Sequence, residues 1–191
     1  MSPRLTTPAA VAAMLVAMMA APAQAADYVQ APGSSLAFAT KYDGEVFTGR
    51  FGGFDTSLRF DPQQLDGARL DVTIELAGTS TGNGDRDSTL AGADFFSVSK
   101  FAQARYVADS FRALGGNDYA ADGTLTLRGV SQPVTLHFTW TAGTPALLSG
   151  RATVKRLDFG VGGGDWADTG LIPDEVAIST RVFLHPAPPA L

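Results

Sequence analysis

The side chains that could carry catalysis or bind a metal are few and scattered in this chain of 191 residues. The two histidines, His137 and His185, lie in separate segments, and neither has a second ligand two or four positions away to complete a metal pair. The chain has no cysteine, which excludes thiolate nucleophiles, disulfides and most structural zinc sites. No Gly-x-Ser-x-Gly segment presents a serine nucleophile. The sequence therefore predicts a protein that is not an enzyme and that binds no metal or other cofactor.

Two short segments resemble binding motifs but lack residues that those motifs need. Asp85-Arg86-Asp87 could begin a calcium loop, yet calcium takes roughly six to eight oxygen ligands and the following residues supply too few. We interpret Asp87 as a helix cap and Arg86 as a bridge between loops. Gly160–Gly164 is rich in glycine, but an aspartate and a tryptophan follow it where a phosphate-binding loop has Lys-Ser or Lys-Thr. This segment indicates a flexible loop.

The first 25 residues have the order of a secretory signal peptide. Arg4 gives a positive start, residues 8–20 form an apolar run, and Ala23-Gln24-Ala25 has the small-x-small pattern of a cleavage site. The apolar run is too short to span a bilayer as a helix. We therefore expect export, cleavage after Ala25 and a periplasmic location; the alternative is an uncleaved anchor.

Length and charge indicate one exported domain that does not bind nucleic acid. The chain carries 14 basic and 19 acidic side chains, a net charge of −5, and no basic stripe that could neutralise phosphates. Residues 26–185 are long enough to form a single domain with a sizeable core. Residues 186–191 are rich in proline and are expected to be a disordered tail. The oligomeric state stays open, and a homodimer is one of the possibilities.

Hydrophobic side chains alternate with polar ones through most of this domain. Over 69–76, Leu70, Val72 and Ile74 alternate with charged and hydroxyl side chains, which is the period of a strand with one buried face. The same alternation recurs over 36–42, 54–60, 134–140, 150–154 and 176–184. Turn residues separate these runs, so we count eight or nine antiparallel strands. Such strands form either a sandwich or a closed barrel.

One segment breaks the alternation. Residues 87–101 have no period of two, and they are expected to contain a short helix that is capped by Asp87 or Ser88. This helix could cover one mouth of a barrel.

The charged alternates argue against a barrel that is inserted in a membrane. A membrane barrel turns its apolar face outward and its polar face inward, which would place Arg69, Asp71 and Arg151 together in the lumen. The sequence also lacks the aromatic girdles of such barrels. We therefore expect a soluble barrel without stable membrane insertion.

Three motifs follow one another along the chain. They are Thr81-Gly82-Asn83 with Arg86-Asp87, Leu90 and Asp94-Phe95-Phe96-Ser97-Val98; Gly123-Thr124-Leu125-Thr126-Leu127-Arg128-Gly129-Val130-Ser131-Gln132-Pro133-Val134; and Arg156-Leu157-Asp158-Phe159-Gly160-Val161. In this order they resemble the motifs of the YceI family of lipocalin-like, exported polyisoprenoid-binding proteins. The chain departs from the family pattern at Thr89, where a histidine is usual, and at Ala102, where a proline is usual. The resemblance implies an all-β fold, an antiparallel lipocalin-like barrel of eight to nine strands with one short helix. It also implies an apolar tunnel that holds a long lipid chain, and it implies no reaction.

The predicted function is therefore non-catalytic binding or carriage of a polyisoprenoid, an isoprenoid quinone or a fatty-acid derivative. The candidate ligand-binding residues are apolar side chains expected to face the lumen. They are Phe38, Phe54, Leu58, Phe60, Leu70, Val72, Ile74, Phe95, Phe96, Leu125, Leu136, Phe138, Trp140, Ala152, Val154, Phe159 and Ile178. Two alternatives remain: a periplasmic redox enzyme or partner that acts on a quinone, and a structural stress-response protein whose lumen is filled by side chains.

Overall fold

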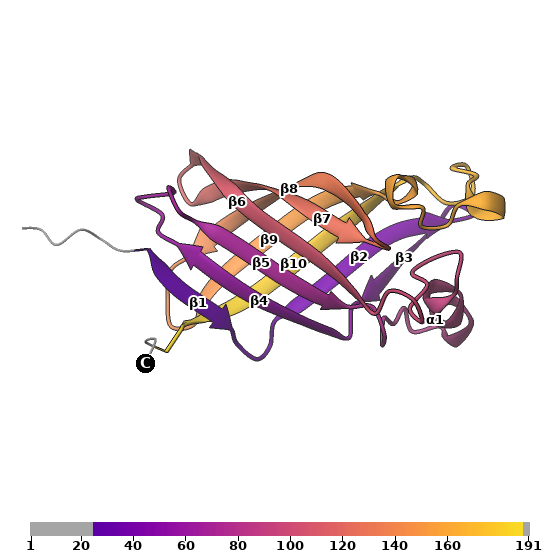
Figure 1. Ribbon diagram of the computed structural model, residues 1–191, viewed down its shortest axis with the longest axis horizontal. Coiled ribbons are helices and arrows are strands. Elements are labelled where there is room, and N and C mark those ends of the chain that lie inside the picture. The colour runs from indigo at the N-terminus through magenta and orange to yellow at the C-terminus, as the bar shows by residue number, and fades with distance from the viewer. Residues whose placement is uncertain (1–24, 189–191) are drawn as a thin grey trace, which may run out of the picture.

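A computed structural model describes residues 25–188 as a ten-stranded antiparallel sheet with one α-helix and two short 3-10 helices (Figure 1). The strands are β1 (Ala26–Gln30), β2 (Ser35–Tyr42), β3 (Glu45–Arg50), β4 (Gly53–Phe60), β5 (Arg69–Glu75), β6 (Gln103–Gly115), β7 (Asp118–Leu127), β8 (Val130–Thr141), β9 (Ala146–Lys155) and β10 (Glu175–Pro186). The helices are α1 (Gly84–Ala91), η1 (Arg156–Phe159) and η2 (Gly164–Trp166). The expected leader lies outside the described residues apart from Ala25, and β10 includes Pro186, the first residue of the expected tail.

The sheet closes into a barrel of eight strands because two of those strands are interrupted. β1 and β2 lie one after the other along β10, with Gln30 opposite Leu184 and Phe38 opposite Ile178. β4 and β3 lie in the same way along β1 and β2. Each interrupted pair serves as one barrel strand, and every other strand pairs with its neighbours in the chain. This confirms the expected all-β, antiparallel, lipocalin-like barrel with one short helix.

The interruption between β1 and β2 is held by a side chain that replaces missing ladder bonds. The hydroxyl of Ser34 accepts a hydrogen bond from the Phe183 amide at 3.0 Å and donates to the Ala31 carbonyl at 2.7 Å. Gly33 makes the turn with φ at +88°, a conformation that glycine adopts without steric cost. The chain therefore bends between β1 and β2 without leaving β10.

The faces expected from alternation agree with the burial of the side chains. Leu58 and Phe60 are buried on β4 while Arg59 between them is exposed, and on β10 Val182 is buried while Arg181 is exposed. On these strands apolar side chains therefore fill or line the interior, and the charged side chains between them lie on the outer wall. No helix within residues 25–188 has both the length and the apolar character needed to cross a membrane.

The helix α1 begins earlier than the sequence analysis expected. Its N-cap is Asn83, whose side chain accepts a hydrogen bond from the Arg86 amide at 3.0 Å, rather than Asp87 or Ser88. The Asp87 carboxylate instead accepts from the Thr81 amide and hydroxyl, both at 2.7 Å. Asp87 therefore ties the helix to the segment before it, and these bonds hold the pKa of its carboxyl below the ordinary value.

Candidate functional site

One end of the barrel is closed by aromatic rings that pack edge to face. Phe60 lies at their centre, with ring-centroid distances of 5.1 Å to Tyr119, 5.2 Å to Trp140 and 5.7 Å to Phe138. Tyr28 adds a further contact to Trp140 at 5.3 Å. We call Tyr28, Phe60, Phe111, Tyr119, Phe138 and Trp140 the aromatic plug. Phe60 lies opposite Ala26 in the β1–β4 ladder, so the aromatic plug lies at the end of the barrel where β1 begins and β10 ends (Figure 1).

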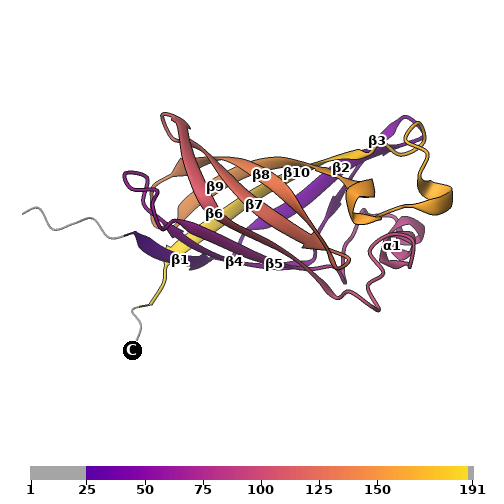
Figure 2. The same cartoon turned by 45° about the horizontal axis from the view of Figure 1, so that its top comes forward.

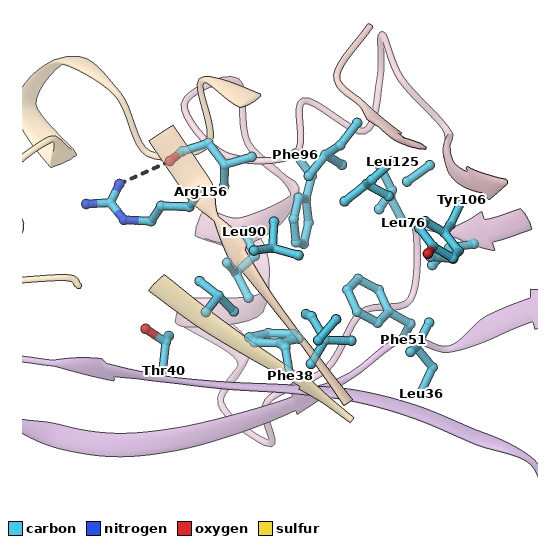
Figure 3. A pocket seen from close by; sticks show the side chains of 18 of the residues that line it. Leu36, Phe38, Thr40, Phe51, Leu76, Leu90, Phe96, Tyr106, Leu125 and Arg156 are labelled. Carbon is cyan, nitrogen blue, oxygen red and sulfur yellow. Dashed lines mark hydrogen bonds between the residues drawn. The ribbon is translucent and has the colours of Figure 1, made fainter. Parts of the chain in front are cut away.

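Between the aromatic plug and α1 the barrel holds a cavity of about 460 Å³ with an almost wholly apolar wall. Figure 3 shows the rings of Phe38, Phe51 and Phe96 around a common space, with Leu90 reaching in from α1. Phe51 bridges the other two rings, with centroid distances of 5.5 Å to Phe38 and 6.1 Å to Phe96. An apolar chain would meet carbon on every side of this space.

The structure brings most of the candidate lumen residues together on the cavity wall. They are Phe38, Phe54, Leu70, Val72, Ile74, Phe95, Phe96, Leu125, Leu136, Ala152, Val154 and Ile178. These residues come from strands all around the barrel and from the segment after α1. Their shared wall is the geometry that a lumen site needs.

Five candidate residues do not line the cavity. Leu58, Phe60, Phe138 and Trp140 lie deeper, in or beside the aromatic plug, and Phe159 is buried at the end of η1. Alternation along a strand reports which face a side chain occupies but not how far along the barrel it lies. The correction therefore concerns depth: these side chains are core rather than cavity wall.

Other wall residues were missed because their strand has little alternation. β3 contributes Phe47, and the link between β3 and β4 contributes Phe51. Gly49 on β3 leaves space for the ring of Phe38: a Cβ at Gly49 would lie 2.2 Å from Phe38 Cζ. The small residue at this position was the available signal, because a glycine within a strand often marks the close approach of another group.

The cavity opens to solvent beside α1. Among its wall residues, Tyr42 at the tip of the β2–β3 hairpin and Asp85 and Thr89 on α1 are exposed. The guanidinium of Arg86 also lies at this rim, 4.2 Å above the ring of Phe47. Figure 2 shows α1 and the segment between β9 and β10 at this same end of the barrel. We call this opening the mouth.

Two arginines hold the segments around the mouth through backbone carbonyls. Arg128, in the turn between β7 and β8, donates to Ala93 and Asp94 before β6 and to Gly160 after η1.

Arg156 is 4% exposed and donates to five carbonyls, those of Val161, Gly162, Trp166, Ile172 and Pro173. Desolvation lowers the pKa of Arg156, and Asp174 opposes that effect. Arg156 follows Ala152 and Val154 at intervals of two residues, and this spacing was the signal that its side chain faces inward as theirs do.

The polar side chains on the inner wall are uncharged, whereas the charged wall residues Asp85, Arg86 and Arg156 lie around the mouth. The hydroxyl of Tyr106 donates to backbone carbonyls of β7 and β8, and burial raises its pKa, so this phenol stays neutral. Thr40 and Thr56 also line the cavity, and their hydroxyl oxygens are buried without a hydrogen-bond partner among the described residues. Within residues 25–188, no three histidine, aspartate or glutamate side chains gather as a metal site would need.

Comparison with known proteins identifies the family of this chain. The model of the YceI-like domain family matches residues 28–184. A UPF0312 protein of Shewanella baltica strain OS185 is 31% identical over 165 residues, which cover 80% of this chain and 85% of that protein. A UPF0312 protein of Pseudomonas syringae pathovar tomato is 28% identical over 166 residues, covering 81% and 86% respectively.

Solved structures share the fold. BcnA of Burkholderia cenocepacia superposes with a TM-score of 0.75 at 30% sequence identity, covering 78% of this chain and 94% of BcnA. A polyisoprenoid binding domain from Saccharophagus degradans, implicated in plant cell wall breakdown, superposes with a TM-score of 0.63 at 17% identity. That match covers 85% of this chain and 99% of the domain, and at this identity it shows the fold alone.

Proposed function

The chain belongs to the YceI-like domain family, and from this premise we propose that it binds a long apolar lipid chain inside its barrel and does not catalyse a reaction. The observation that carries the proposal is the cavity between the aromatic plug and the mouth. It is enclosed by aliphatic and aromatic side chains and opens at one end beside α1. The occupant is a polyisoprenoid, an isoprenoid quinone or a fatty-acid derivative, with its chain inside and its head group toward the mouth.

The binding free energy of a ligand in this cavity comes mainly from burial of its apolar chain. Each CH₂ removed from water contributes roughly 0.8 kcal/mol, so a five-carbon prenyl unit contributes about 3–4 kcal/mol before losses of entropy. One neutral hydrogen bond to a head group adds only about 1 kcal/mol. Chain length therefore dominates the affinity. The polyisoprenoid binding domain from Saccharophagus degradans shares this fold, which supports a long apolar ligand.

The open cavity separates this function from a barrel that is filled by its own side chains. The aromatic plug shows what a filled interior looks like in this protein, and it ends before the level of Thr56 and Leu70. A quinone would fit the same wall as any other isoprenoid, carried as a ligand. We favour binding over the redox alternative because most of the side chains on the wall are hydrocarbon.

We also propose that the protein works in the periplasm after removal of residues 1–25. Carriage of a water-insoluble chain across an aqueous compartment gives a use for a barrel with an apolar interior. The intact mass of the exported protein tests this: a chain beginning at Ala26 is expected, and a chain beginning at Met1 contradicts it.

Native mass spectrometry of freshly purified protein tests the binding function. We expect a mass above that of the polypeptide, and we expect organic extraction to release a long-chain lipid and remove the excess. A bare polypeptide that also fails to take up added prenol or fatty amide would contradict the proposal.

A further inference from the structure

Thr56 is a polar side chain on the inner wall of an apolar cavity. It is 1% exposed, it lines the cavity, and its Oγ1 finds no hydrogen-bond partner among the described residues. On β4 the inward side chains run Phe54, Thr56 and Leu58 toward the aromatic plug, and Leu58 does not line the cavity. Thr56 therefore marks the inner end of the cavity on this strand.

Two other hydroxyls on the wall are already engaged, whereas that of Thr40, which is also unpartnered among the described residues, lies on β2 nearer the mouth. Tyr106 donates to the Ala121 carbonyl at 2.8 Å, and Thr180 donates to the Ser35 carbonyl at 3.1 Å. A buried hydroxyl without a partner is unfavourable, and valine would fill the same volume without that cost. The hydroxyl of Thr56 can rotate about its Cβ–Oγ bond, so it is able to donate to, or accept from, a group inside the cavity.

We infer that Thr56 recognises a neutral oxygen at the buried end of the ligand. This inference rests on the proposed lipid-binding function and narrows its ligand class to a long apolar chain that carries, besides the head group at the mouth, a hydroxyl or carbonyl group at the opposite end, which reaches the inner wall. A carboxylate or phosphate does not fit there, because burying an unpaired charge is far more costly than burying a neutral polar group. The wall residues nearest the plug on the other strands carry no positive charge; they include Leu70, Leu136, Leu148 and Val182.

Gln30 offers a competing explanation for the same hydroxyl. The β1–β4 ladder ends at the pair Val29 and Ser57, and Gln30 and Thr56 are the next residues on the two strands. The Gln30 Nε2 donates to the Phe54 carbonyl at 2.9 Å, and its Oε1 is buried without a partner among the described residues. A small rotation that joined Thr56 to Gln30 would satisfy both atoms and leave no hydroxyl for a ligand. The two explanations predict different behaviour of Thr56→Val.

The experiment compares saturated fatty amides with ω-hydroxy fatty amides of the same length, over a series of lengths. Each pair keeps the same head group at the mouth and differs only at the buried end. For the unmodified protein we expect the ω-hydroxy chain to bind about fivefold more tightly at the length that reaches Thr56, which is the net effect of one neutral hydrogen bond. Thr56→Val should abolish this preference, and Thr56→Ser should retain it. Thr180→Val is the matched control, since its hydroxyl is already engaged and the preference should persist.

Thermal unfolding without ligand completes the test. We expect Thr56→Val to keep or raise the melting temperature, because it removes an unpartnered buried hydroxyl. Two results together would show that Thr56 serves Gln30 and would overturn the inference. They are a lower melting temperature of Thr56→Val and equal binding of both amides by the unmodified protein at every length. If neither amide binds the unmodified protein at any length, the proposed lipid-binding function itself fails, and the inference fails with it.

Discussion

Phe60 and Trp140 meet edge to face inside the barrel, with their ring centroids 5.2 Å apart and their planes at 62°. Together with the other rings of the aromatic plug they end the cavity, so an occupant that enters at the mouth can penetrate only to this contact. The barrel is thus a pocket with a floor rather than an open tube.

Removing a ring from the floor should deepen the cavity and weaken the fold. Phe60→Ala should lower the free energy of unfolding by about 3–5 kcal/mol, the usual cost of truncating a buried aromatic side chain. If the variant stays folded, it should accept longer chains than the unmodified protein does. Chemical denaturation and titration with chains of increasing length measure the two effects. Leu114→Ala, at a side chain that is 48% exposed, should change neither. An unchanged length limit would mean that Phe60 is not the floor.

Blocking the wall should abolish binding without unfolding the protein. Ala152 lines the cavity, and the next residue, Thr153, is exposed on the outer wall. Ala152→Trp should place an indole where the ligand chain lies, so binding should fall sharply while stability changes little. Thr153→Trp is the control and should leave both nearly intact. Thermal melts and ligand titration of both variants provide the measurement. A loss of about 1–3 kcal/mol in Ala152→Trp would indicate overpacking of an already filled interior.

The stability of the segments around the mouth should depend on Arg156. Arg156→Met keeps much of the length of the side chain but removes the donors for five carbonyls. Because buried carbonyls would lose their partners, we expect a loss of about 3 kcal/mol in the free energy of unfolding. Faster ligand release is also expected, because the segments around the mouth lose their common anchor. Arg151→Met, at an exposed arginine on β9, should change the stability very little. Equal stability of the two variants would contradict the role given to Arg156.

Acid should weaken the fold through carboxylates that are paired on the outer wall. Asp71 accepts hydrogen bonds from Arg105 at 2.6 and 2.9 Å, and these bonds hold the pKa of its carboxyl below the ordinary value. A carboxyl with a lowered pKa in the folded state contributes stability that is fully present above its ordinary pKa of about 3.9 and is lost as the pH falls through the lowered value. Stability should therefore be nearly constant from pH 7 to about pH 5 and should fall below pH 4.

Denaturation midpoints of Asp71→Asn between pH 7 and pH 2 test whether ionised Asp71 contributes to the loss of stability in acid. The variant should be less stable than the unmodified protein at pH 7, and the difference should shrink in acid. Asp55→Asn changes an exposed carboxylate that has no ion pair within the described residues, and it serves as the control. A difference that persists unchanged at pH 2 would assign the loss to something other than ionisation.

Alternation in the sequence predicted antiparallel strands and their inward faces, because a period of two is fixed by strand geometry. The choice of a barrel over a sandwich came from the family resemblance. Phe38 and Phe60 show where this information ends: both face inward, yet one lines the cavity and the other closes it. The depth of a side chain along the barrel depends on how far neighbouring strands are shifted relative to one another, and the sequence of a single strand does not contain that information. Arg156 escaped prediction for a different reason, since its carbonyl partners come from a loop whose path follows from no local pattern.

Binding affinity as a function of chain length tests the central claim most directly. With saturated fatty amides or prenols of increasing length, the account predicts an affinity gain of up to about threefold to fourfold for each added CH₂, before losses of entropy. The gain should stop once the chain reaches the aromatic plug, and a change of head group should matter little. Affinity that follows the charge of the head group and does not change with chain length would contradict the account.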